Sequence, residues 1–171
     1  MTISMHQALV PPLVQMLESL SAVLTKGAQF AAERGIEPAV LLEARLAPDM
    51  FALVRQVQVA TYQAKGGAAR LAGVEVPSWP DTEASFPELE ARVRRAADYL
   101  KGFRADQIEG SETRAIVVKA GGRELHFKGR EYLFGFVYPN FFFHVTATYA
   151  ILRHNGVGLG KRDFLGAVPL A

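Results

Sequence analysis

The histidines are the residues of this chain best suited to chemistry, because an imidazole can bind a metal ion or transfer a proton near neutral pH. Two of the four lie in one apolar stretch, as His144 and His154. Thr148 follows His144 by one helical turn and falls on the same line. The two histidines are ten residues apart, which is about 15 Å along a helix axis. They cannot share one ion on a straight helix, because metal–ligand bonds are only about 2 Å long.

Two interpretations of His144 are open from the sequence. In the first, the imidazole is a buried group held by a hydrogen bond to Gln56, Gln58 or Tyr62 on another helix. In the second, it is a metal ligand or catalytic base in a small-molecule pocket between apolar helices. The candidate pocket residues are His144, Gln56, Gln58, Tyr62, Thr148 and Tyr149.

The stretch that carries His144 has the start and stop signals of a helix. Pro139 suits the first helical position, where its missing N–H would have no partner. Gly156 suits the left-handed position after the last turn. Between them the chain is apolar nearly all round, including residues 141–143, which favours a helix buried among other helices. The aromatic run also suits a pocket wall or the face of a homodimer.

Three further long helices are predicted, at residues 5–33, 48–71 and 86–103, because apolar side chains recur there at intervals of three and four. Pro11-Pro12 interrupts the first of them. Either this helix begins at Pro11, or a short turn around residues 4–9 precedes it with a kink, because an internal proline removes a backbone hydrogen bond.

A hairpin is predicted before the last helix. Residues 113–119 and 123–128 alternate in polarity, and glycines lie between them. A lone hairpin is marginally stable in water, so it should rest on the helices. Residues 131–136 suit a short helix, and residues 157–166 a glycine-rich loop. We therefore predict one domain over residues 1–171, mainly all-α: a four-helix bundle with a small β-hairpin before its last helix.

Composition excludes several functions. The 171 residues include no cysteine, so disulfides and thiolate metal sites are ruled out. The formal net charge is +2 without a basic cluster, which argues against nucleic acid or an anionic membrane as a partner. No targeting segment is apparent at the N-terminus, and no stretch of about 18 uninterrupted apolar residues suggests a membrane span. We expect a cytoplasmic protein.

Three C-terminal segments together resemble a known group of proteins: Pro139-Asn-Phe-Phe-Phe-His144, residues 149–156 and Gly160-Lys-Arg-Asp-Phe-Leu-Gly166. With Gln56-Val-Gln58 and residues 69–73, they are similar to an uncharacterised bacterial branch of the DinB/YfiT-like superfamily. The resemblance covers nearly the whole chain. It implies a four-helix bundle that is often dimeric. Some superfamily members use a divalent metal to transfer small thiols or open small rings, and others have no known activity.

The resemblance also implies where a metal would bind. In the superfamily, one histidine comes from the second helix and two come from the last helix, in a His-x-x-x-His arrangement. This chain has no histidine in its second helix, and Thr148 stands four residues after His144. Only His144 remains as a candidate ligand for zinc or nickel. The set of three histidines is incomplete, so no cofactor is expected with the usual site.

Three functions follow as hypotheses. The leading one is a cytoplasmic protein with a degenerate metal site that binds a small molecule or serves in a stress response. The first alternative is a transferase or hydrolase acting on a small molecule, with or without a metal, from a pocket near His144. The second is a homodimeric interaction module that uses its aromatic face.

Overall fold

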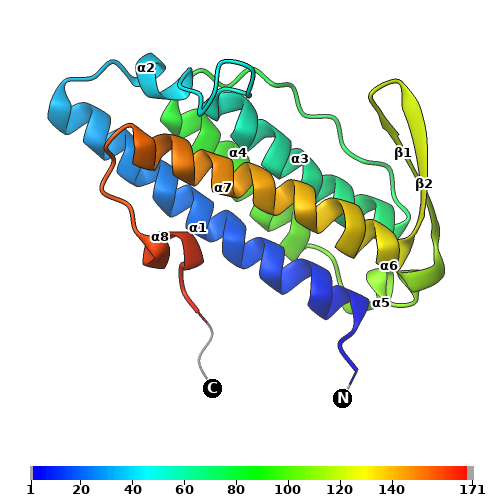
Figure 1. The fold of residues 1–171 in the computed structure, drawn as a ribbon. Helices are drawn as coiled ribbons and strands as arrows, with labels where there is room; N and C mark the ends of the chain where they lie inside the picture. The colour runs from blue at the N-terminus through cyan, green and yellow to red at the C-terminus, as the bar shows by residue number, and fades with distance from the viewer. Residues whose placement is uncertain (1, 169–171) are drawn as a thin grey trace.

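Four long helices lie side by side, and a hairpin projects at one end of the bundle (Figure 1). The structure, a computed structural model, describes residues 2–168. The long helices are α1 (Met5–Arg34), α3 (Leu53–Ala72), α4 (Phe86–Lys101) and α7 (Tyr138–His154). α1 packs mainly against α4, and α3 mainly against α7. The prediction of a mainly helical bundle with a hairpin before the last long helix is confirmed.

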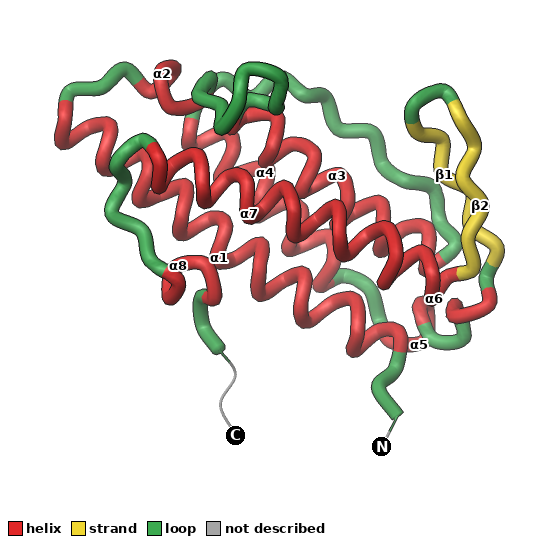
Figure 2. Tube along the Cα trace, in the orientation of Figure 1, coloured by secondary structure: helices red, strands yellow, loops and turns green. Residues whose placement is uncertain are grey.

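Short helical elements lie between the long helices and after the last of them (Figure 2). They are α2 (Pro38–Leu42), α5 (Ala105–Ile108), η1 (Ser111–Thr113), α6 (Gly129–Tyr132), η2 (Leu133–Val137) and α8 (Lys161–Leu165). η2 is a π-helical turn that runs directly into α7. The loop predicted at residues 157–166 is partly wrong, because α8 forms there and packs against α1. Lys26 Nζ donates to Asp163 Oδ1 at 2.7 Å and joins the two helices.

The range predicted for the first helix, residues 5–33, agrees with α1, but the helix passes through its two prolines without interruption, so neither alternative for a break at Pro11-Pro12 is correct. The helix begins at Met5 with Ser4 as its N-cap, since Ser4 Oγ accepts from Gln7 N at 3.2 Å. In a regular helix the N–H of residue 12 would bond the carbonyl of Ala8, and Pro12 lacks that N–H. The Tyr138 hydroxyl donates to the Ala8 carbonyl instead. A side chain of α7 thus satisfies the acceptor that the proline leaves free.

α3 begins at Leu53, five residues after the predicted start at Pro48. The preceding residues form turns that are tied to the connection from α2. Arg45 Nη1 donates to the Met50 carbonyl at 2.7 Å, and Leu53 N donates to the Ala44 carbonyl at 3.0 Å. These bonds orient Phe51 and the first turn of α3 beside α7.

The hairpin pairs β1 (Ala115–Ala120) with β2 (Arg123–Lys128) in antiparallel register. Gly121 and Gly122 have φ values of 56° and 74°, the left-handed region that a tight two-residue turn requires. Ile116 and Val118 are buried, which confirms that the hairpin rests on the helices. Its tip extends toward the side of α3 that faces residues 74–85 (Figure 1).

α1 is the longest helix in the described part of the chain. It is long and apolar enough to cross a membrane by composition alone, with a mean hydropathy of 1.4 over 18 residues. In this bundle 56% of that window is buried, and its leucines Leu9, Leu13 and Leu17 are completely covered. A helix at the centre of a bundle core has the same composition, which accounts for the pattern.

Candidate functional site

His144 lies inside the bundle and is bound to Gln56 of the neighbouring helix. The residue is 7% exposed, and its Nδ1 is 2.6 Å from Gln56 Oε1. Gln56 Nε2 donates to the Phe51 carbonyl at 3.1 Å, which fixes Oε1 as the atom that faces the imidazole. His144 Nδ1 therefore carries the hydrogen and donates it to Gln56. This contact agrees with the first interpretation of His144, a buried imidazole held by a hydrogen bond to another helix.

The surroundings favour the neutral form of the imidazole. Burial lowers the pKa of His144, and the positive charge of Arg55 lowers it further. The Phe51 ring stacks on the imidazole with centroids 6.4 Å apart, and Phe143 meets it edge-on at 5.1 Å. An imidazole enclosed in this way, with one nitrogen committed to Gln56, is held in one orientation.

The structure brings only part of the predicted pocket together. Thr148 is fully buried near His144, but its hydroxyl donates to the His144 carbonyl at 2.9 Å, as within one helix. Gln58 and Tyr62 line a different cavity on the side of α3 toward residues 74–85. Tyr149 packs against Phe164 of α8, with ring centroids 5.8 Å apart. The predicted residues therefore divide among three places.

The residues present do not fit the metal site that the superfamily resemblance implies. Gln56 and Thr148 stand beside His144, where further histidines would be needed, and both already use their polar atoms in hydrogen bonds. Among residues 2–168, no group of three histidine, aspartate or glutamate side chains could hold an ion.

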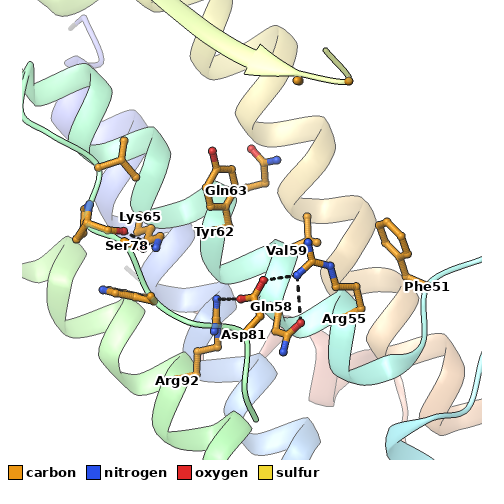
Figure 3. Close-up of a pocket in the computed structure, with 15 residues that line it drawn as sticks. Phe51, Arg55, Gln58, Val59, Tyr62, Gln63, Lys65, Ser78, Asp81 and Arg92 are labelled. Atoms are coloured by element: carbon orange, nitrogen blue, oxygen red, sulfur yellow. Dashed lines mark hydrogen bonds and ion pairs between the residues drawn. The ribbon is translucent and has the colours of Figure 1, made fainter. Parts of the chain in front are cut away.

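A cavity with a volume of about 720 Å³ lies beside the His144 region (Figure 3). α3 forms one wall, and residues 76–79 and 81 form the opposite wall. Ala120 and Gly121 of the hairpin tip contribute to its lining. Phe51 lies at one end, so the ring that stacks on His144 also borders this cavity. A volume of this size is in the range of small-molecule sites.

A buried arginine holds the outer wall in place. Arg92 of α4 is 5% exposed, and its Nε donates to Thr61 Oγ1 of α3 at 2.8 Å. Its Nη atoms donate to the Pro80 carbonyl at 3.0 Å and to Glu83 Oε1 and Asp81 Oδ1, both at 2.8 Å. This guanidinium thereby ties residues 80–83 to both helices.

Two α3 side chains extend the same network. Arg55 donates to Asp81 and, at 3.2 Å, to Gln58 Oε1 (Figure 3). Gln58 Nε2 donates to Glu83 Oε2 at 3.0 Å. We call Arg55, Gln58, Asp81, Glu83 and Arg92 the wall cluster. Both carboxylates in it face guanidinium groups, and each is thus neutralised locally.

A lysine and the chain's single tryptophan lie further along the same cavity. Lys65 is 2% exposed, and its Nζ lies 4.3 Å from the centroid of the Trp79 ring. Nζ donates to the Pro77 carbonyl at 2.6 Å. Arg95 of α4 also contacts Trp79, 4.4 Å from the ring centroid. Burial lowers the pKa of Lys65 to about 8, and nearby Arg92 adds to the effect.

Lys65 and the charged part of the wall cluster were not predicted as site residues from the sequence. Charged side chains on helices usually lie at the surface, so residue type alone does not indicate a site here. A signal was nevertheless available for Arg92, which lies three residues after Leu89 and four before Ala96, on the apolar line of its helix. The homodimer stays a prediction, and Phe143 on its proposed face is 55% exposed.

Comparisons with known proteins agree with this architecture. Residues 5–165 match the family described as "Domain of unknown function (DUF1993)". The chain is similar to the crystal structure of a DinB family member protein from Shewanella denitrificans, with 37% identity and a TM-score of 0.86. The match covers 97% of this chain and 94% of that one. No curated protein matches the chain. The chain belongs to the DUF1993 family and has the DinB-like fold.

Proposed function

We propose that this protein is a cytoplasmic binder of small molecules and works without the metal of its wider superfamily. The observation that carries the proposal is the cavity of about 720 Å³ between α3 and residues 76–81. Apolar side chains such as Val59 and Val76 line it together with a comparable number of polar and charged ones, so the cavity offers both apolar surface and groups that can orient an organic ligand.

The state of His144 supports the metal-free part of the proposal. The bond to Gln56 leaves the Nε2 lone pair of His144 free, but a metal ion needs further ligands at bonding distance, and residues 2–168 contain no group of three histidine, aspartate or glutamate side chains that could hold one. The His144 Nδ1–H is donated to Gln56, and the amide of Gln56 is itself fixed by the Phe51 carbonyl. This chain of bonds links the first turn of α3 to α7 and leaves the imidazole a structural role next to the cavity.

The metal-free state can be tested by elemental analysis of protein purified without an affinity tag. We expect less than stoichiometric zinc and nickel, because residues 2–168 contain no group of three side chains that could hold an ion with His144. The double variant Gln56→His, Thr148→His is the positive control. It supplies the second-helix histidine and the His-x-x-x-His pair, and it is expected to gain one tightly bound zinc. Stoichiometric metal in the natural protein would contradict the proposal.

Ligand binding can be measured with a chemically diverse set of small molecules. Trp79 is the only tryptophan of the chain and lines the cavity, so its emission reports occupancy directly. We expect binders whose affinity falls at least about tenfold in Val59→Phe, because the larger ring occupies cavity volume. Val117→Phe, on an exposed position of β1, is the matched control and should bind normally. Binders that are insensitive to Val59→Phe would place the site elsewhere.

A further inference from the structure

We propose that Lys65 is the anchor of this cavity and that the ligand is a small organic monocarboxylate with an apolar body. The inference rests on the proposed function and names its ligand class. Lys65 lines the cavity, is 2% exposed, and uses one of its three N–H groups on the Pro77 carbonyl. Within residues 2–168, it forms no ion pair with a carboxylate. A buried ammonium in this state has unused capacity for an anion.

The charges around Lys65 favour an anion at this position. Three positively charged side chains lower the pKa of Lys65, namely those of Arg92, Arg95 and Arg70. Asp81 is the one negatively charged group that raises it. Asp81 is itself paired with Arg55 and Arg92. Glu83, the other acid of the wall cluster, is paired with Arg92. The cavity therefore has an excess of positive charge that its own carboxylates do not neutralise.

The number and kind of free donors in the cavity indicate a ligand with a single negative charge. Arg55 is paired with Asp81, and Arg92 is paired with Asp81 and Glu83, so among the described residues Lys65 is the cation of the cavity lining that lacks a carboxylate partner. Phosphate groups are usually held by several donors at once, often a guanidinium fork. A carboxylate needs only one or two. At pH 7 the lysine is still mainly protonated, because its pKa is about 8.

The remaining lining indicates an apolar body. The ring centroids of Tyr62 and Trp79 lie 5.7 and 4.3 Å from Lys65 Nζ. Val59 and Val76 line the same cavity. These side chains would cover a hydrocarbon ring or short chain while the carboxylate meets Lys65. Burial of the apolar part supplies affinity, and the charge supplies selection against neutral molecules.

The test is a titration of the full chain with cyclohexanecarboxylate and its neutral counterpart cyclohexanecarboxamide, followed through Trp79 emission at pH 7. We expect the carboxamide to bind at least about tenfold more weakly, the effect of losing one charge-assisted hydrogen bond. Lys65→Met should lower carboxylate affinity by the same factor. Lys101→Met is the control, because Lys101 pairs with Glu18 on the exposed surface and should not affect binding.

Two further readouts separate an anchor from a structural lysine. Lys65→Met should raise the melting temperature, because it removes a buried ammonium that lacks a carboxylate partner. Carboxylate affinity should fall between pH 7 and pH 9 as the amine loses its proton, and this fall should be absent in Lys65→Met. A variant that melts at a lower temperature and keeps full affinity would overturn the inference.

The possible results also distinguish this inference from the proposed function. Equal binding of carboxylate and carboxamide, still sensitive to Val59→Phe, would retain the small-molecule site and reject Lys65 as its anchor. Tighter binding of inorganic phosphate than of the carboxylate would reject the monocarboxylate. Failure of both cyclohexane compounds to bind would also reject the inference, and the diverse set of compounds then decides the proposed function by itself.

Discussion

Gly129→Ala is expected to destabilise the protein by about 3 kcal/mol or more, at the upper end of overpacking effects. Gly129 begins α6, directly after β2, and lies against the turn that contains Ser111. A Cβ atom there would be 1.9 Å from the Ser111 carbonyl oxygen and 3.1 Å from Leu71 Cδ2. The first contact is with buried backbone, which cannot rotate away as a side chain can. Urea denaturation measures the loss.

Gly135→Ala is the matched control, because no atom lies within 4 Å of a Cβ built at that helical position. Alanine should be neutral there or stabilise by up to about 1 kcal/mol, as expected from helix propensity. The pair therefore isolates the collision from the general effect of adding a methyl group. If the two variants unfold at the same urea concentration, α6 does not pack closely on Ser111.

The helices could be predicted from the sequence because their apolar spacing is a local property. The continuity of α1 could not, because the group that replaces the missing N–H of Pro12 is the hydroxyl of Tyr138, which lies 130 positions from the Ala8 carbonyl that it binds. The late start of α3 has a similar origin, since Arg45 binds Met50 before the helix and the Ala44 carbonyl accepts from the first helical residue, Leu53. Local rules fail where a distant side chain or a connection satisfies the backbone.

The sequence indicated the hydrogen-bonded histidine of the candidate site but not the cavity beside it. Gln56 was one of three possible partners for His144, and the relative rotation of α3 and α7 selected it. That same rotation turns Gln58 toward Glu83 and Tyr62 toward Arg70, away from the imidazole. Residues two apart on a helix point in different directions, so all three could not face one partner. The position of residues 76–81, which creates the cavity, depends on long-range ion pairs that periodicity does not reveal.

Arg92→Ala is expected to cost about 3 kcal/mol, the lower end of the range for removing one partner of a buried charge pair. The lower end applies because the side chain of Asp81 is 41% exposed and water can replace its partner. Glu83 is only 13% exposed and would keep an uncompensated charge. Arg94→Ala is the control on the same helix. Its side chain is 63% exposed, so a change within about 0.5 kcal/mol is expected.

The destabilisation in Arg92→Ala should be largest in the cavity wall that Arg92 holds. Amides of residues 76–84 should lose hydrogen-exchange protection in Arg92→Ala, because the bonds to Pro80, Asp81 and Glu83 hold that wall against α4. Unchanged protection there would show that other contacts hold the wall.

A double variant separates the two roles of the guanidinium. If most of the destabilisation comes from the charge left on Glu83, Arg92→Met with Glu83→Gln should be clearly more stable than Arg92→Met alone, because no buried charge then lacks a partner. The wall should nevertheless lack protection, and ligand affinity should be lower than in the natural protein, since neither new side chain reaches Pro80 and Asp81. Recovery of stability without recovery of binding would mean that the wall cluster serves mainly to shape the cavity. Recovery of both would show that the cavity forms without it.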